Sequence, residues 1–200
     1  MPRRADPERK PAMLAAIIEA LRDRPLSSVT FRSLAEALDV STFALVYHFG
    51  THDELVVEIV QGLVARQQGI IEAERSAPPT LDAHLEAVRE SWHGAMQPLV
   101  RPLLRLEMEA ALLEVVRPDL RAGARDVHAR WLQWQTDSLE RLGVPADRAA
   151  LESRLLVDQL YGLQFDLVIS GDDAAVESLS QRAIDDYRER ITAVLVEPSA

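Results

Sequence analysis

Few residues of this 200-residue chain have the types and spacing that catalysis requires. Glu90 and His93 form a Glu-x-x-His pair, which on a helix brings a carboxylate and an imidazole together as carboxylate-bridged di-metal sites require. Such a site needs a second pair and two further carboxylates, and no second Glu-x-x-His occurs in the sequence. His-Glu-x-x-His, Gly-x-Ser-x-Gly and glycine-rich phosphate loops are also missing from the sequence. The sequence therefore predicts neither an enzyme nor a metal or cofactor site.

Aromatic and sulfur-containing side chains with polar neighbours gather instead between residues 92 and 165. An apolar cavity with a few converging polar groups is the usual form of a small-molecule site. The same side chains at helical spacing also suit plain core, so both interpretations stay open for each residue. The candidate effector-binding residues are Trp92, His93, Met96, Met108, His128, Trp131, Trp134, Gln159, Tyr161 and Phe165.

Two short amphipathic helices joined by a tight turn are predicted over residues 30 to 50. Thr30 can cap the first helix, whose apolar side has the i, i+3, i+4, i+7 spacing. That side consists of Phe31, Leu34, Ala35 and Leu38. Asp39 tolerates the left-handed backbone that closes a helix, and Ser41 can cap a second helix from Thr42 to Phe49. The arrangement is a helix-turn-helix signature.

The second of these helices has two unlike sides. Leu45 and Phe49 lie one turn apart and are predicted to face the core, whereas Phe43, Val46 and Tyr47 share the opposite side with Thr42. Proteins normally bury phenylalanine and tyrosine rings. Leaving them on the outer side of a short helix predicts a contact surface.

These segments resemble the TetR family of bacterial transcriptional regulators. The likeness covers residues 11 to 60 and rests on the segments TFRSLA from Thr30, VS from Val40, L-x-YHF from Leu45 and DEL from Asp53. The chain departs from the family pattern at Asp39, where Gly is usual, at Val46, where Tyr is usual, and at His52, where Lys is usual. The resemblance implies a homodimeric repressor that binds two-fold operator DNA and is released by a small effector.

The second helix has an unusual composition for a DNA reader, because it contains no Arg, Lys, Asn or Gln. Those side chains make the bidentate contacts to guanine and adenine. We therefore expect reading through hydroxyl groups, apolar contact with thymine methyl groups and DNA shape, with phosphate contacts around the helix ends and an arm in the minor groove. The predicted DNA-binding residues are Arg3, Arg4, Thr30, Arg32, Ser41, Thr42, Phe43, Ala44, Val46, Tyr47, His48, Thr51 and His52.

His52 adds a pH dependence to this prediction. It stands where the family has a lysine that contacts phosphate, and a histidine carries full charge only in mildly acidic solution. Operator binding is therefore predicted to weaken between about pH 6 and pH 8.

The whole chain is predicted to be all-α, because no segment shows the sustained alternation of a half-buried strand. Helices are expected at about 11–24, 30–38, 42–50, 53–75, 80–97, 99–116, 119–142, 146–170 and 173–196. The predicted domains are a flexible basic arm at 1–10, a helix-turn-helix domain at 11–55, and a helical effector-binding and dimerisation domain at 56–200.

The last two helices are long and amphipathic, and they can pair with a second copy into a four-helix bundle or supply ordinary core. The family resemblance favours the homodimer. Their apolar residues are Leu151, Leu155, Leu160, Leu163 and Leu167 on one helix, and Val176, Leu179, Ile184, Ile191, Val194 and Leu195 on the other.

Composition limits the remaining choices. A 48% hydrophobic content can form a full core, and the sequence has no cysteine and no apolar run of membrane-spanning length, so we expect a cytoplasmic protein that spans no membrane. The net charge is -10, yet residues 1 to 55 hold seven basic and eight acidic groups. We call residues 1 to 55 the head, and because it is nearly neutral we expect it to attract DNA phosphates weakly. It leaves open an alternative, a helical interaction or ligand-binding protein that has lost operator binding.

Overall fold

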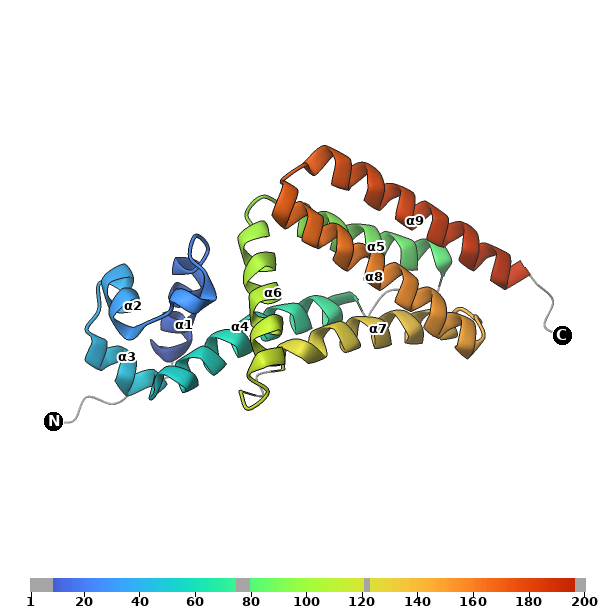
Figure 1. The fold of residues 1–200 in the computed structure, drawn as a ribbon. Coiled ribbons are helices and arrows are strands. Elements are labelled where there is room, and N and C mark those ends of the chain that lie inside the picture. The colour runs from blue at the N-terminus through green and yellow to red at the C-terminus, as the bar shows by residue number, and fades with distance from the viewer. Residues whose placement is uncertain (1–8, 75–79, 121–122, 197–200) are drawn as a thin grey trace. The chain divides into compact units, whose positions relative to one another are not determined.

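The computed structural model describes residues 9–74, 80–120 and 123–196, with backbone alone at 67–74 and 125. Over these residues the fold is all-α, with nine α-helices, one short 3-10 helix and no strand (Figure 1), so the predicted fold class is confirmed. The elements are α1 (Arg9–Ala20), η1 (Leu26–Ser28), α2 (Phe31–Leu38), α3 (Thr42–Phe49), α4 (His52–Glu74), α5 (Leu81–Met96), α6 (Arg101–Val116), α7 (Ala124–Arg141), α8 (Ala146–Ser170) and α9 (Asp173–Val196).

Two compact units divide the chain. The first comprises Met1–Gln67 and Arg105–Arg125, and the second comprises Gln68–Leu104 and Asp126–Ala200. The helices α4, α6 and α7 each contribute to both units. None of the described helices is long and apolar enough to cross a membrane.

The ends of α2 and α3 follow from local hydrogen bonds. Thr30 and Ser33 form a capping box, in which the Ser33 amide donates to Thr30 Oγ1 at 3.0 Å and the Thr30 amide donates to Ser33 Oγ at 3.1 Å. Asp39 closes α2 with a φ of 52°, in the left-handed region. Ser41 then caps α3, because its Oγ accepts from the Ala44 amide at 3.1 Å. All three predicted roles are confirmed.

The first unit has an aliphatic core. Its fully buried side chains come from α1 to α4, α6 and the turn after α1, and they include Ile17, Leu21, Leu34, Leu45, Leu55, Ile59, Leu63 and Leu106. Burial of these side chains from several short helices supplies the main stabilising free energy, since helices of eight residues are not stable alone. The unit therefore positions α3 without help from the outer side of that helix.

Helix α1 ends at Ala20, so the predicted extension to residue 24 is wrong. The reason lies on α6, where Arg105 Nη2 donates to the carbonyl oxygens of Leu21, Arg22 and Arg24 at 2.9 to 3.1 Å. These carbonyls belong to the turn after the helix. Glu109 of α6 accepts from the Leu26 amide at 2.6 Å and so holds the first residue of η1.

Helix α7 also differs from the prediction, because it begins at Ala124 and not near residue 119. Gly123 has a φ of 87°, which is incompatible with a right-handed helix. Helices α8 and α9 match the predicted ranges of 146–170 and 173–196.

The second unit is built on α8 and α9, which lie side by side (Figure 1). Helix α5 packs against both of them, and residues of α7 join the same core. This core includes Leu85, Trp134, Leu156, Ile184 and Tyr187. A smaller cluster consists of Trp92, Leu104, Leu167 and Val176. Aromatic side chains thus form part of the core in this unit.

Candidate nucleic-acid interface and effector site

Helix α3 exposes three large side chains on one side. Phe43 is 76% exposed, Val46 45% and Tyr47 68%, and their i, i+3, i+4 spacing keeps them on a single face. Leu45 and Phe49 on the other side are buried. The two-sided character predicted for this helix is confirmed. We call Thr42, Phe43, Val46 and Tyr47 the α3 face.

The polar atoms at the start of α3 are available for further bonds. Ser41 Oγ accepts from the Ala44 amide, which leaves its hydroxyl hydrogen free to donate. Thr42 is exposed beside it, while the small Ala44 side chain is half-buried. Of the residues predicted to read bases, the structure therefore brings Thr42, Phe43, Val46 and Tyr47 to one surface.

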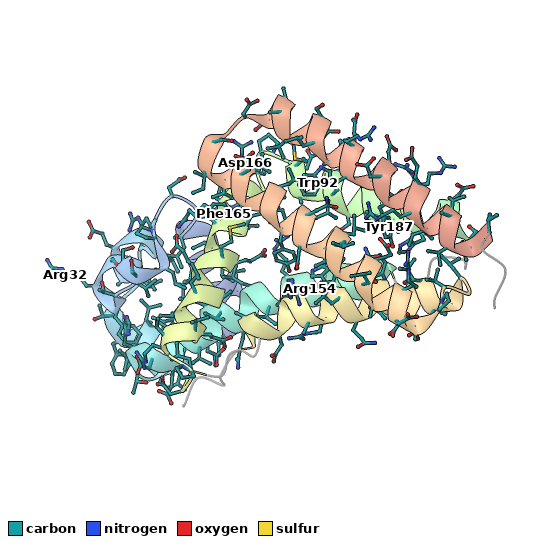
Figure 2. All side chains as sticks on the ribbon, turned by 45° about the vertical axis from the view of Figure 1, so that its right-hand side comes forward. Arg32, Trp92, Arg154, Phe165, Asp166 and Tyr187 are labelled. Carbon is teal, nitrogen blue, oxygen red and sulfur yellow. The ribbon has the colours of Figure 1, made fainter. Side chains whose placement is uncertain are left out.

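Arg32 stands in the first turn of α2 and projects into solvent (Figure 2). Within the described part of the chain its guanidinium makes no hydrogen bond or ion pair, so it is free to contact an anion. His48 is half-buried, with the Tyr47 ring 5.1 Å and the Phe49 ring 6.5 Å from its own. Arg3 and Arg4 lie outside the described residues.

Thr51 and Glu54 form a capping box at the start of α4. Glu54 Oε2 accepts from the Thr51 amide at 2.6 Å and from Thr51 Oγ1 at 2.8 Å. These bonds, the backbone bond first, lower the pKa of Glu54. Gly50 precedes the box with a φ of 71°, and a Cβ at that position would collide with the Glu54 carboxylate. The hydroxyl predicted to contact phosphate is therefore bound to an internal carboxylate.

The predicted contacts of His52 also meet internal partners. Its Nε2 lies 2.8 Å from the Val29 carbonyl oxygen, to which it donates, and its Nδ1 lies 3.7 Å from Asp53 Oδ1. His52 thereby ties the start of α4 to the segment before α2. Its role at phosphate stays a prediction.

Charged groups near the start of α4 are mostly paired. Asp53 accepts from Arg117 at 2.9 Å, and Arg117 also binds Asp119. The hydrogen bonds to Asp119 and then to Asp53 raise the pKa of Arg117. Lys10 pairs with Glu58 at 2.6 Å and lies 5.6 Å from the centre of the Phe49 ring. These pairs reduce the effect of the acidic side chains on the potential around α3.

Several of the predicted effector-binding residues meet in the second unit. The rings of Trp131 and Trp134 are perpendicular with their centres 5.7 Å apart. His128 lies 5.1 Å from the Tyr161 ring centre, and its Nε2 lies 2.9 Å from Asp158 Oδ1. Trp131 packs against the larger core cluster, to which Trp134 belongs.

Trp92 and Met96 lie in the smaller cluster (Figure 2 labels Trp92). Leu160 packs against both clusters and so connects them. Four of the predicted residues, Trp92, Met96, Trp131 and Trp134, thus belong to two neighbouring apolar regions of one unit.

Four other predicted effector-binding residues are placed elsewhere. His93 and Gln159 are exposed, and Phe165 on α8 is 58% exposed. Met108 belongs to the first unit. Sequence spacing alone does not show which side of a helix is covered by its neighbours, and for these four residues an effector contact stays a prediction.

Four buried polar atoms on uncharged side chains of the second unit have no hydrogen-bond partner within the described residues. They are Trp92 Nε1, Trp134 Nε1, Gln135 Oε1 and Ser153 Oγ. Buried polar groups are normally paired, so each of these atoms needs an explanation such as a bound molecule. No pattern in the sequence singles out Gln135 or Ser153.

A depression of about 660 Å³ opens beside Trp134, and Asp137, Glu140 and Arg141 also line it. Its volume is typical of small-molecule sites. The three charged residues were missed from the sequence, although Asp137 and Arg141, three and seven residues after Trp134, have the spacing that places them on its side of α7. Their charge contrasts with the largely apolar effector that was expected.

His84 and Tyr187 form a buried polar pair that was also missed. His84 Nε2 lies 2.9 Å from the Tyr187 hydroxyl, and the His84 ring contacts Trp134 at 5.8 Å. Burial, and then the charge of Arg141, lowers the pKa of His84 to about 4. Burial, followed by the charge of Glu152, raises the pKa of Tyr187. Both side chains are therefore neutral at pH 7.

No metal centre forms around the Glu90 and His93 pair in the described part of the chain. A group of three or more acidic, histidine or cysteine ligands is not found among the described residues.

Comparison with solved structures identifies the fold. The structure is similar to a TetR transcriptional regulator from Legionella pneumophila, with a TM-score of 0.70 and 14% identity over 93% of this chain and 98% of that one. It is also similar to a TetR-family member from Streptomyces coelicolor, with a TM-score of 0.65 and 23% identity over 94% and 98%. No protein-family model and no curated protein sequence matches the chain.

A further similar structure is the multidrug binding protein EbrR complexed with imidazole, with a TM-score of 0.63 and 24% identity over 100% of this chain and 96% of that one. The chain therefore has the fold of TetR-type transcriptional regulators, and the predicted resemblance is confirmed at the level of the fold.

Proposed function

We propose that this chain, which has the fold of TetR-type regulators, is a transcriptional repressor that binds operator DNA as a homodimer and is released by a small molecule. The observation that carries the proposal is the α3 face. Phe43 and Tyr47 stay exposed on a helix whose two ends are fixed by Ser41 and by the capping box of α4. A fold that keeps two aromatic rings in water at a helix-turn-helix supports a contact role.

In this proposal α3 enters the major groove and the surrounding groups contact phosphates. Arg32 supplies a free positive charge near the start of α2, and the Ser41 hydroxyl supplies a donor at the start of α3. The amides of the first turn of α3 add the partial positive charge of a helix N-terminus. Thr51 and His52 contact phosphate only after exchanging their internal partners.

The homodimer is proposed to form through α8 and α9. The apolar residues of these helices separate into buried and exposed sets, and Leu167, Val176, Ile184 and Ile191 belong to the core of the unit. Exposed positions remain along the outer side of α8 and near both ends of α9. They are Leu151, Leu155, Phe165, Ile169, Leu179, Leu195 and Val196. A second copy can cover such a surface by two-fold pairing.

Light scattering tests the dimer. Leu155→Glu places a charge on the exposed side of α8 and is expected to shift the protein from dimer to monomer at micromolar concentration. Leu112→Glu is the control, because Leu112 is also an exposed leucine but lies on α6. A dimer unaffected by Leu155→Glu would contradict the proposed interface.

The effector is proposed to bind in the second unit near Trp92, Trp131 and Trp134. The unpartnered indole N–H groups of Trp92 and Trp134 support a ligand that is apolar overall and carries a hydrogen-bond acceptor. Release follows if the ligand binds one conformation of the dimer better than the conformation that fits DNA.

Trp92→Phe and Trp134→Phe test this site, because they keep the rings and remove the N–H groups. All three tryptophans lie between residues 92 and 134, so intrinsic fluorescence reports on ligands added from a panel of small apolar acceptors. We expect hits that quench the wild-type protein and bind the variants several-fold more weakly. Unchanged affinity in both variants would contradict the site.

Operator binding is the main test. DNA from around the chain's own gene is titrated with wild-type protein and with a Phe43→Ala, Tyr47→Ala variant, over a range of salt concentrations. We expect the wild-type protein to prefer this DNA over random sequence, with a moderate salt dependence because residues 1 to 55 are nearly neutral. The variant should lose at least about a hundredfold in affinity, since two exposed rings no longer become buried. Leu112→Ala is the control for removal of an exposed apolar side chain in the same unit.

Failure of this test has a defined meaning. If the wild-type protein prefers no DNA over random sequence even at low salt, the proposal is wrong. The alternative then holds, a helical interaction or ligand-binding protein that has kept the fold and lost operator binding.

A further inference from the structure

The α3 face offers an unusual set of groups to a DNA groove. It presents one phenyl ring, one isopropyl group, one phenol and one threonine side chain, and none of its residues can donate a bidentate pair of hydrogen bonds. Guanine and adenine are normally read by such pairs. The only apolar group that a base edge shows in the major groove is the C5-methyl group of thymine.

We infer that the α3 face recognises the C5-methyl groups of pyrimidines, so that 5-methylcytosine can replace thymine at the contacted positions. The inference rests on the proposed function and specifies what the helix reads. Phe43 and Val46 make apolar contacts with the methyl groups, and Tyr47 adds a ring edge and a hydroxyl.

The spacing of the face fits this reading. Phe43 and Tyr47 are four residues apart and therefore about 6 Å apart along the helix axis. Successive base pairs rise by about 3.4 Å, so the two rings match methyl groups about two base steps apart. Val46 lies between them on the same side.

The charges around the α3 face also favour DNA with an apolar base edge at the contact. Helix α3 carries no acidic residue, and two carboxylates at the start of α4 are engaged, Asp53 by Arg117 and Glu54 by Thr51. Arg32 stays free at the start of α2. The uncharged α3 face can lie against an apolar base edge. Arg32 and the N-terminus of α3 can then contact the anionic phosphates on either side of it.

The near-neutral head also increases the share of affinity that the methyl contacts supply. Residues 1 to 55 carry seven basic against eight acidic groups, so phosphate attraction is weak. Binding then depends on apolar burial more than it does for a basic head. Cytosine methylation at a contacted position would strengthen binding, because it adds the same methyl group at the same place in the groove.

The test uses an operator selected by the wild-type protein from random duplex DNA. Each thymine is replaced in turn by deoxyuridine, which removes only the methyl group, and each cytosine by 5-methylcytosine. We expect the affinity to fall about fourfold for each contacted thymine that is replaced by deoxyuridine, which is the factor for one buried methyl-sized group. Where a contacted thymine has been replaced by cytosine, methylation of that cytosine should raise the affinity by a similar factor.

Variants assign the contacts. In Phe43→Ala the thymine-to-deoxyuridine loss should vanish at the positions that Phe43 touches, while Phe43→Leu, which keeps an apolar side chain, should retain part of it. Leu112→Ala should show the wild-type pattern. Circular dichroism of each variant confirms that the helices form.

The outcomes separate the two proposals. Equal binding of thymine and deoxyuridine operators by the wild-type protein would overturn the methyl inference and leave the proposed function standing. Selection that yields no preferred sequence over random DNA would overturn the proposed function itself.

Discussion

Two pairs of aromatic residues, one in each unit, differ sharply in exposure. In the first unit Phe43 and Tyr47 are exposed on α3, whereas in the second Trp134 and Tyr187 are fully buried. The first unit is stabilised by aliphatic side chains and helix caps, so its outward rings are free for contact. The second unit uses these rings for packing, yet two of its indole N–H groups have no partner among the described residues. The same residue type is thus left exposed in one unit, where we propose a contact role, and used for packing in the other.

The largest test of the contrast compares two tyrosines. Tyr187→Ala is expected to lower the free energy of unfolding of the second unit by about 3 to 5 kcal/mol, because it removes a fully buried ring. Tyr47→Ala is expected to change stability by less than about 0.5 kcal/mol, because its ring is exposed. Urea unfolding is followed by circular dichroism for both units and by tryptophan fluorescence for the second. Equal losses in the two variants would remove the distinction.

The next test uses the buried His84. Unfolded His84 titrates near pH 6.5 and folded His84 near pH 4, so between these values the unfolded chain binds the additional proton. Stability from this group is therefore complete above pH 6.5 and is lost as the pH falls toward 4. Between pH 7 and pH 5 the expected loss is about 2 kcal/mol.

His84→Gln sharpens this prediction, because glutamine can still bond to the Tyr187 hydroxyl but does not titrate. The variant should unfold in urea with a smaller difference between pH 7 and pH 5 than the wild type. His93→Gln, at an exposed position of the same helix, serves as the control. If His84→Gln loses as much stability between pH 7 and pH 5 as the wild type does, another group causes the acid sensitivity.

A smaller effect is expected in the first unit at Asp39. Its φ of 52° is strained for a residue with a side chain, so Asp39→Gly should stabilise the head by about 0.5 to 1 kcal/mol. Asp39→Ala, which lacks both the flexibility of glycine and the polar group of aspartate, should destabilise it. Thermal unfolding of both variants gives the ranking, and a destabilised Asp39→Gly would show that the carboxylate has a role of its own.

The smallest expected effect concerns His52. Wild-type operator binding should weaken a few-fold between about pH 6 and pH 8, and His52→Lys should flatten part of that profile, because lysine stays charged throughout. Fluorescence anisotropy at constant ionic strength measures both. Because His52 also donates to the Val29 carbonyl, thermal stability is compared in parallel. An identical pH profile in His52→Lys would contradict a charge contact at this position.

The sequence predicted well those features that depend on neighbouring residues. The caps at Thr30 and Ser41, the left-handed Asp39 and the two sides of α3 were all confirmed, because each is decided within a few residues. The end of α1 was not predicted, since Arg105 lies more than 80 residues away from the carbonyls it binds.

Membership of the effector site was less accessible from the sequence for the same reason. Trp134 and Phe165 both appear as aromatic residues on amphipathic helices, but one is buried by three other helices and the other faces outward. The buried bond of His84 to Tyr187 joins residues 103 positions apart. Only the packing of the helices decides such pairs.

The capping box of α4 has a consequence for how tightly the head can hold a duplex. The free protein already carries an anion at the amide of Thr51, because the Glu54 carboxylate is bonded there. A phosphate arriving at this helix end must displace a carboxylate that is tethered and so acts at high effective concentration. The net gain in binding free energy is therefore small, because a hydrogen bond from the Thr51 amide to phosphate replaces a similar bond to the Glu54 carboxylate. Glu54 thus behaves as a built-in competitor, and only DNA that already fits the α3 face will benefit from replacing it.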